Sequence, residues 1–156
     1  MILLAALITL FLSAFFSRRR FGILGLGLVA GAVISPIWGE TAGYVLSATG
    51  LIPEGPLVAM TALSLLILLP AFLLMFHGYT YKNVFGRIAG ALMFTVFAAA
   101  FLIGPVGDVI AFLGPAAIAY EWLVANRELI ISAGVALSVV DLLIAMPTHK
   151  GERRRR

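Results

Sequence analysis

The sequence predicts an all-α integral membrane protein with about five transmembrane helices, and three observations lead to this fold class. Of its 156 residues, 62% are hydrophobic and only 12% are charged, whereas a water-soluble domain has about a quarter charged residues. The apolar residues form continuous runs rather than the alternating pattern of a membrane β-strand. The basic residues cluster between or after these runs. Because backbone groups in hydrocarbon must be satisfied internally, such runs are expected to be helices.

Five apolar runs are long enough to be transmembrane spans. At about 1.5 Å per residue, runs of roughly 16 to 20 residues cover about 24 to 30 Å, close to the thickness of the hydrocarbon layer. Together they predict a single membrane domain over residues 1–147, followed by a basic tail at 148–156. The expected spans are residues 1–16, 21–38, 57–76, 88–103 and 129–146.

The basic residues predict the orientation of these spans. Cytoplasmic loops of membrane proteins carry an excess of Lys and Arg. With the N-terminus outside, every basic residue except Arg127 falls on the cytoplasmic side, and five of the acidic residues fall outside. We therefore expect an external N-terminus and a cytoplasmic C-terminus. A cleaved signal peptide would need its positive charge before the first apolar run, not after it.

Two connections are expected on the outer side. Residues 39–56 are predicted to be a loop, with turns around Gly50 and Pro53, and part of it could dip into the interface. Residues 109–126 are predicted to be a short interfacial element before the last span, because Gly114-Pro115 would break a sixth span. A re-entrant segment, or a helix that starts near Pro115 and runs on into the last span, stays open.

The glycine-rich second run contains a GxGxxxG spacing from Gly25 to Gly31, directly after three arginines. A dinucleotide-binding loop would need a preceding strand and a soluble βαβ unit. In an apolar helix, small residues four apart instead allow another helix to approach closely. We therefore expect helix packing, against another span, another copy of the chain or a larger membrane complex. The glycines expected to pack are Gly22, Gly25, Gly27, Gly31, Gly86 and Gly90.

Asp141 is the one ionisable residue expected inside a span, about 8 Å from the cytoplasmic end of the last helix. Acidic residues at this depth are costly and usually have a partner. Arg87, Lys82 and His77 are expected at the same end, so an Asp141–Arg87 pair or a hydrogen bond to a neighbouring helix would satisfy the carboxylate. The alternative is a proton or cation relay, for which the other spans offer only hydroxyl groups.

The sequence contains little material for catalysis or cofactor binding. It has no cysteine and only two histidines, which argues against a metal site, and no HExxH or GxSxG motif is present. We expect no enzymatic activity, no cofactor and no nucleic-acid partner. The expected partner of the basic groups is the anionic lipid headgroup; they are Arg18, Arg19, Arg20, Arg153, Arg154, Arg155 and Arg156.

The order of these features resembles a known family. A first span with an external N-terminus is followed by SRRRFG, a glycine-rich span, an outer loop, a strongly apolar span and NVFGRIAGALMFTVFAAAFLIGPV. Over residues 1–106 this order is similar to the colicin V production protein family of small bacterial inner-membrane proteins. The most telling parts are Arg19-Arg20-Phe21-Gly22, and Arg87 with Gly86 and Gly90. The resemblance implies a non-enzymatic, multi-pass protein of the bacterial cytoplasmic membrane, associated with toxin production or export and with envelope homeostasis.

Two functional hypotheses follow from the sequence. In the first, the protein acts through helix packing and assembly with itself or with an export machine. In the second, it is a small channel or transporter in which Asp141 lines a proton or ion pathway. The surroundings of Asp141 discriminate between the two, since transport needs a hydrated pathway there and assembly does not.

Overall fold

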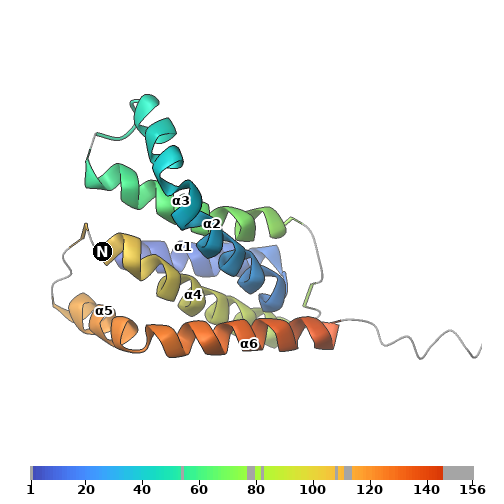
Figure 1. Ribbon diagram of the computed structural model, residues 1–156. Helices are drawn as coiled ribbons and strands as arrows, with labels where there is room; N and C mark the ends of the chain where they lie inside the picture. Colours follow the sequence, from blue (N-terminus) through green and yellow to red (C-terminus); the bar gives the residue numbers. More distant parts are fainter. Residues whose placement is uncertain are drawn as a thin grey trace, which may run out of the picture.

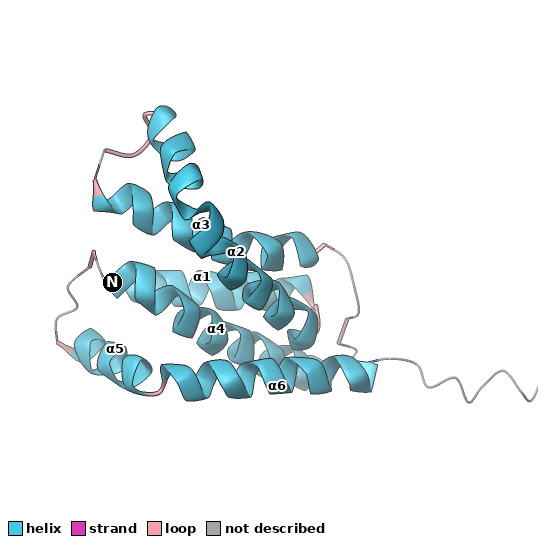
Figure 2. Ribbon diagram, viewed as in Figure 1, coloured by secondary structure: helices cyan, strands magenta, loops and turns pink. Residues whose placement is uncertain are grey.

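The computed structural model describes residues 2–53, 55–76, 80–81, 83–107, 109–110 and 114–145. These residues form six helices joined by short connections (Figures 1 and 2), and one isolated β-bridge links Arg19 to Thr80. The all-α fold class is confirmed. The helices are α1 (Ile2–Ser17), α2 (Phe21–Ala48), α3 (Pro56–Leu74), α4 (Val84–Gly107), α5 (Pro115–Ala125) and α6 (Arg127–Ala145).

Four of these helices, α2, α3, α4 and α6, are long and apolar enough to cross a membrane. They overlap four of the five predicted spans. The described apolar part of α1, Leu4–Ser17, is a shorter helix. Prolines lie inside α2, α3 and α4, at Pro36, Pro70 and Pro105; each lacks one backbone N–H, and helices packed inside a membrane tolerate this loss.

The helices form a bundle with two distinct ends. Figure 1 shows α1, α3, α4 and α6 running along its length, while α2 crosses them and its last part projects beyond α3. We call the end at which α2 begins and α6 ends the arginine end, because it carries Arg18, Arg19, Arg20 and Arg87. The short helix α5 lies at the opposite end, which we call the α5 end.

Helix α4 forms the centre of the bundle and contacts each of the other five helices. Phe94 and Phe97 on its buried side are almost fully enclosed. The Phe97 ring lies 5.9 Å from the Phe21 ring of α2 in an edge-on arrangement, which aromatic pairs favour. This contact fixes the start of α2 against α4, next to the polar residues at the arginine end.

The second helix is longer than the sequence predicted. The loop expected at residues 39–56 is wrong for its first part, because α2 continues to Ala48. No proline interrupts this part, and the strong turn signals all come later. Gly50 has a φ of +65° and Gly55 a φ of +139°, conformations that favour glycine, and the turn expected around Gly50 is confirmed.

The element expected at residues 109–126 contains the helix α5, which begins at Pro115 after Gly114 in a left-handed conformation. It does not run on into the last span as a regular helix. Asn126, with φ −106° and ψ 8°, separates α5 from α6. Helix α5 therefore begins at the Gly114-Pro115 pair, and the chain bends at Asn126 before the last long helix.

Helices α2 and α3 meet at two of the predicted packing glycines. A Cβ atom on Gly27 would come within 2.8 Å of the Ala71 Cα, and one on Gly31 would collide with the Ile67 carbonyl group. Ala71 is completely buried in this contact. These two glycines therefore let the backbones of α2 and α3 approach each other within one chain.

Candidate functional site

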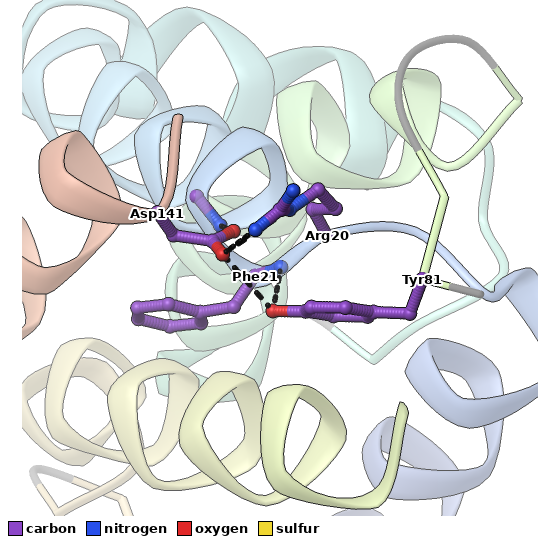
Figure 3. A network of polar contacts seen from close by, with 5 residues as sticks. Arg20, Phe21, Tyr81 and Asp141 are labelled. Atoms are coloured by element: carbon purple, nitrogen blue, oxygen red, sulfur yellow. Dashed lines mark hydrogen bonds and ion pairs between the residues drawn. The ribbon is translucent and has the colours of Figure 1, made fainter. Parts of the chain in front are cut away.

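A polar cluster at the arginine end joins the last helix to the beginning of the second. Asp141 lies in the last turns of α6, and Arg20 precedes the first residue of α2 in an extended conformation. The Arg20 guanidinium donates hydrogen bonds to Asp141 Oδ1 from Nη2, at 2.8 Å, and from Nε, at 3.2 Å (Figure 3). Their side chains are 19% and 16% exposed. The ion pair is therefore mostly enclosed, although it lies near the end of the bundle.

The other oxygen of Asp141 binds the N-terminus of α2. The backbone N–H of Gly22 donates to Asp141 Oδ2 at 2.9 Å. The first N–H groups of a helix lack partners within the helix, and Arg20 makes no side-chain cap of its own. A carboxylate at this position is also favoured by the helix dipole. Asp141 thus acts as an N-terminal cap supplied by a different helix.

Tyr81 completes the cluster from the connection between α3 and α4. Its hydroxyl accepts a hydrogen bond from the Phe21 N–H at 3.2 Å and donates to Asp141 Oδ1 at 3.4 Å (Figure 3). Its ring also lies 5.3 Å from the Arg20 guanidinium. The cluster therefore ties together α2, α6 and the α3–α4 connection.

The surroundings of Arg20 and Tyr81 raise the pKa values of both side chains. The hydrogen bond to Asp141 raises the pKa of the Arg20 guanidinium above its ordinary value. Burial raises the pKa of the Tyr81 hydroxyl above its ordinary value of 10.0. The raised pKa of Tyr81 means that its hydroxyl stays protonated, and can donate to Asp141, to a higher pH than an exposed tyrosine would.

Two further predicted glycines bring α2 close to α6. A Cβ atom on Gly22 would come within 2.5 Å of the Ser138 carbonyl oxygen, and one on Gly25 would collide with the Ser138 side chain. Ser138 is fully buried, and its hydroxyl donates to the Gly134 carbonyl at 2.7 Å. The close approach of the two helices brings the Asp141 carboxylate within reach of the Gly22 N–H.

Two other arginines at this end bind the C-terminal carbonyl groups of neighbouring helices. Arg19 donates to the carbonyl oxygens of Met75 at 2.9 Å and Phe76 at 2.7 Å, directly after α3. Arg87 donates to the Phe15 carbonyl of α1 at 3.1 Å, and its guanidinium lies 4.4 Å from the Phe15 ring. The last carbonyl groups of a helix lack partners within the helix, and basic side chains are favourable there.

The structure places several predicted residues differently from the sequence interpretation. Arg87 binds Phe15 rather than Asp141, so the candidate Asp141–Arg87 pair is replaced by the Asp141–Arg20 pair. The space over Gly86 and Gly90 is filled by the ring of Tyr81 from the preceding connection, not by a helix. Arg18 is exposed. His77, Lys82 and Arg153 to Arg156 lie outside the described residues.

Sequence reasoning missed the roles of Arg20 and Tyr81. The sequence predicts that Arg20 binds lipid headgroups. Its position directly before a span, however, puts it at the same depth as Asp141, and the same is true of Arg87. Tyr81 carried no signal beyond its place next to a span. Which of several side chains at one depth meets Asp141 depends on how the helices are arranged around one another, and hydropathy does not contain this information.

The arrangement is suited to holding helices together. Both oxygens of Asp141 accept hydrogen bonds from fixed donors. Oδ1 binds the Arg20 guanidinium, and Oδ2 binds the backbone N–H of Gly22. Charge-assisted hydrogen bonds of this kind are among the stronger polar contacts in proteins. In the part of the chain that the structure describes, no group of three or more His, Cys, Asp or Glu side chains is placed to hold a metal ion.

Comparisons with models of known protein families, with curated proteins and with solved structures found no match. The fold and the cluster therefore define the class of protein by themselves. Long apolar helices cross one another with small residues at their contacts, and arginines gather at one end. The chain is a multi-pass membrane protein.

Proposed function

We propose that this protein is a structural component of a membrane assembly, without enzymatic activity. The observation that carries the proposal is the complete engagement of the Asp141 carboxylate by Arg20 and the α2 N-terminus. A relay residue must release and rebind a proton or ion, whereas this carboxylate would first have to break an ion pair and uncap a helix. Asp141 therefore serves to hold α6 on α2.

The proposed orientation has the arginine end in the cytoplasm and the α5 end outside. Support comes from the distribution of basic residues in the sequence and from the gathering of Arg18, Arg19, Arg20 and Arg87 at one end of the bundle. In this proposal α1 is a fifth span, short but free of charge, that packs against α4.

The biological setting of the proposal is the bacterial cytoplasmic membrane and the production or export of protein toxins. Its support is the resemblance of residues 1–106 to colicin V production proteins. A direct test is complementation. In a colicin V-producing strain that lacks its own production protein, the chain should restore toxin release, and failure despite normal membrane insertion would remove this setting from the proposal.

Reconstitution separates the structural proposal from transport. Purified protein in liposomes that contain a pH-sensitive dye should give the same proton leak as empty liposomes, and Asp141→Asn should not change it. A parallel measurement of Na⁺ and K⁺ flux covers other cations. Flux that is present in the wild type and lost in correctly folded Asp141→Asn would replace the structural proposal with a channel or transporter.

The absence of cysteine from the chain makes the proposed orientation straightforward to measure. Single cysteines are introduced at exposed positions, Arg18→Cys at the arginine end and Glu121→Cys on α5. In intact cells, a membrane-impermeant maleimide should label Glu121→Cys and should reach Arg18→Cys only after the membrane is opened. The reverse pattern would invert the proposed orientation.

A further inference from the structure

A cavity of about 280 Å³ lies between α1, α3, α4 and α5, away from the polar cluster and toward the α5 end of the bundle. Its walls come from the first half of α1, the first half of α3 and the second half of α4, and residues of α5 line one side. The lining is almost entirely apolar. The residues used below are Leu10, Met60, Ser64, Ala99, Leu102 and Tyr120.

One hydroxyl group in this apolar lining has no partner. Ser64 Oγ is buried and makes no hydrogen bond to any residue that the structure describes. Several other helical hydroxyls bind a backbone carbonyl three or four residues earlier. Thr61, one turn before on the same helix, donates to Leu57 at 2.7 Å, and Thr95 of α4 donates to Ala91 at 2.8 Å. Ser64 departs from this pattern at the wall of a cavity.

A buried hydroxyl without a hydrogen bond is unfavourable, and native structures nearly always satisfy it. A trapped water molecule is a poor solution, because such a water needs about two to four polar partners. In this cavity the Ser64 hydroxyl would be one hydrogen-bond partner for a water molecule. The Tyr120 hydroxyl lies against Gly107 of α4. A better occupant is an apolar molecule with one acceptor oxygen aimed at Ser64.

The depth of Ser64 restricts the kind of molecule. It lies eight residues after Pro56, which begins α3, and therefore about 12 Å along the helix from that end. Half of the hydrocarbon layer is only about 15 Å thick. The ester groups of a phospholipid stay with its headgroup at the interface, so they do not reach Ser64. An ionised carboxylate is also unfavourable at this depth.

From these observations we infer that the cavity binds a neutral lipid with no anchoring headgroup, whose carbonyl oxygen accepts a hydrogen bond from Ser64. A prenyl quinone and a neutral fatty ester share this chemistry. The volume is just below the usual range for small-molecule sites, about 300 to 1,000 Å³, and it suits the carbonyl-bearing end of the molecule. The inference is independent of the proposed structural role, because the cavity shares no residue with the Asp141 cluster.

Tryptophan fluorescence provides the test, because Trp122 is on the same helix, α5, as two lining residues and lies between them in the sequence. These residues are Tyr120 and Leu123. In a Trp38→Phe background, full-length protein in phosphatidylcholine nanodiscs is titrated with decylubiquinone, a short-chain quinone that quenches tryptophan. We expect a saturable component of quenching. Ser64→Ala should weaken the apparent affinity about two- to tenfold, the range for one lost neutral hydrogen bond, and it adds no volume that would disturb the fold.

Two matched variants locate the binding. Ala99→Phe fills the cavity and should abolish the saturable component, whereas Leu69→Phe, on an exposed part of α3, should leave it intact. Circular dichroism of each variant confirms that it is folded. Quenching that only rises in proportion to the quinone content of the membrane, equally in all variants, would overturn the inference.

Competition identifies the chemistry of the occupant. Methyl palmitate, a neutral fatty ester that does not quench, should displace the quinone if a lipid carbonyl is the recognised group. Dodecane, which has no carbonyl, should compete at least about fivefold more weakly. Equal competition by dodecane, together with unchanged binding in Ser64→Ala, would contradict the role of the Ser64 hydroxyl.

Discussion

Asp141 Oδ1 lies 2.8 Å from Arg20 Nη2, although the two residues are separated by 121 positions in the chain. This ion pair attaches the C-terminal end of α6 to the first turn of α2. Because the neighbouring Gly22 N–H binds the second carboxylate oxygen, the contact has both a charged and a backbone component. The stability of the α2–α6 contact should therefore depend on Asp141 more than on other acidic residues.

Replacement of Asp141 by alanine should lower the free energy of unfolding by about 2 to 4 kcal/mol. It removes charge-assisted hydrogen bonds and leaves Arg20 and the Gly22 N–H without their acceptor. The measurement is steric-trapping or denaturant unfolding of the protein in bicelles. Glu121→Ala, which removes an exposed acidic residue from α5, is the matched control and should change the free energy by less than about 0.5 kcal/mol.

Glycine-to-alanine substitutions on α2 should have opposite effects at two positions. Gly31→Ala places a methyl group against the Ile67 carbonyl of α3, whereas Gly43→Ala meets nothing within 4 Å. Gly31→Ala should destabilise the protein by about 1 to 3 kcal/mol. Gly43→Ala should be neutral or stabilising by up to about 1 kcal/mol, because alanine favours the helix. Equal effects at both positions would show that α2 and α3 do not approach closely at Gly31.

The neighbouring arginines of the α1–α2 connection should not be equivalent. Arg19→Ala removes hydrogen bonds to the carbonyl groups of Met75 and Phe76 and should cost about 1 to 3 kcal/mol. Arg18→Ala removes the same charge from an exposed side chain and should cost less than about 0.5 kcal/mol. Similar losses in the two variants, measured by the same unfolding assay, would argue against a capping role for Arg19.

Alkaline pH should destabilise the protein partly through Tyr81. Its pKa is raised in the folded state, so the folded state binds the hydroxyl proton more tightly than the unfolded state does. This contribution to stability is fully present below about pH 10 and is lost as the pH rises through the folded-state pKa. Tyr81→Phe should therefore lower stability at neutral pH but reduce its decline above pH 10. An unchanged alkaline slope would contradict the burial of Tyr81.

The sequence was informative about the helices and much less so about their contacts. The expected spans at 57–76, 88–103 and 129–146 correspond to α3, α4 and α6, because hydrocarbon requires long apolar segments and these are visible in one dimension. The expected end of the second span at residue 38 was wrong by ten residues. Glycines at positions 39 and 43 were interpreted as loop residues, although a packed membrane helix accommodates them.

The polar cluster shows where sequence reasoning stopped. The unusual position of Asp141 was evident from one acidic residue in an apolar run. Its partner was not, since Arg20 and Arg87 both lie at the right depth and only the lateral order of the helices distinguishes them. Tyr81 was missed for the same reason, because its ring reaches Gly86 and Gly90 by folding back across the start of α4.

A double-mutant cycle on Arg20 and Asp141 tests the structural role of the pair most directly. The free energy of unfolding is measured in bicelles for the wild type, Arg20→Gln, Asp141→Asn and the double variant. If the two side chains stabilise the bundle through each other, the double variant should be less destabilised than the sum of the single variants, by at least about 1 kcal/mol. Single effects that add to within about 0.3 kcal/mol would show that the two residues act separately, and the account of Asp141 as the attachment of α6 to α2 would be wrong.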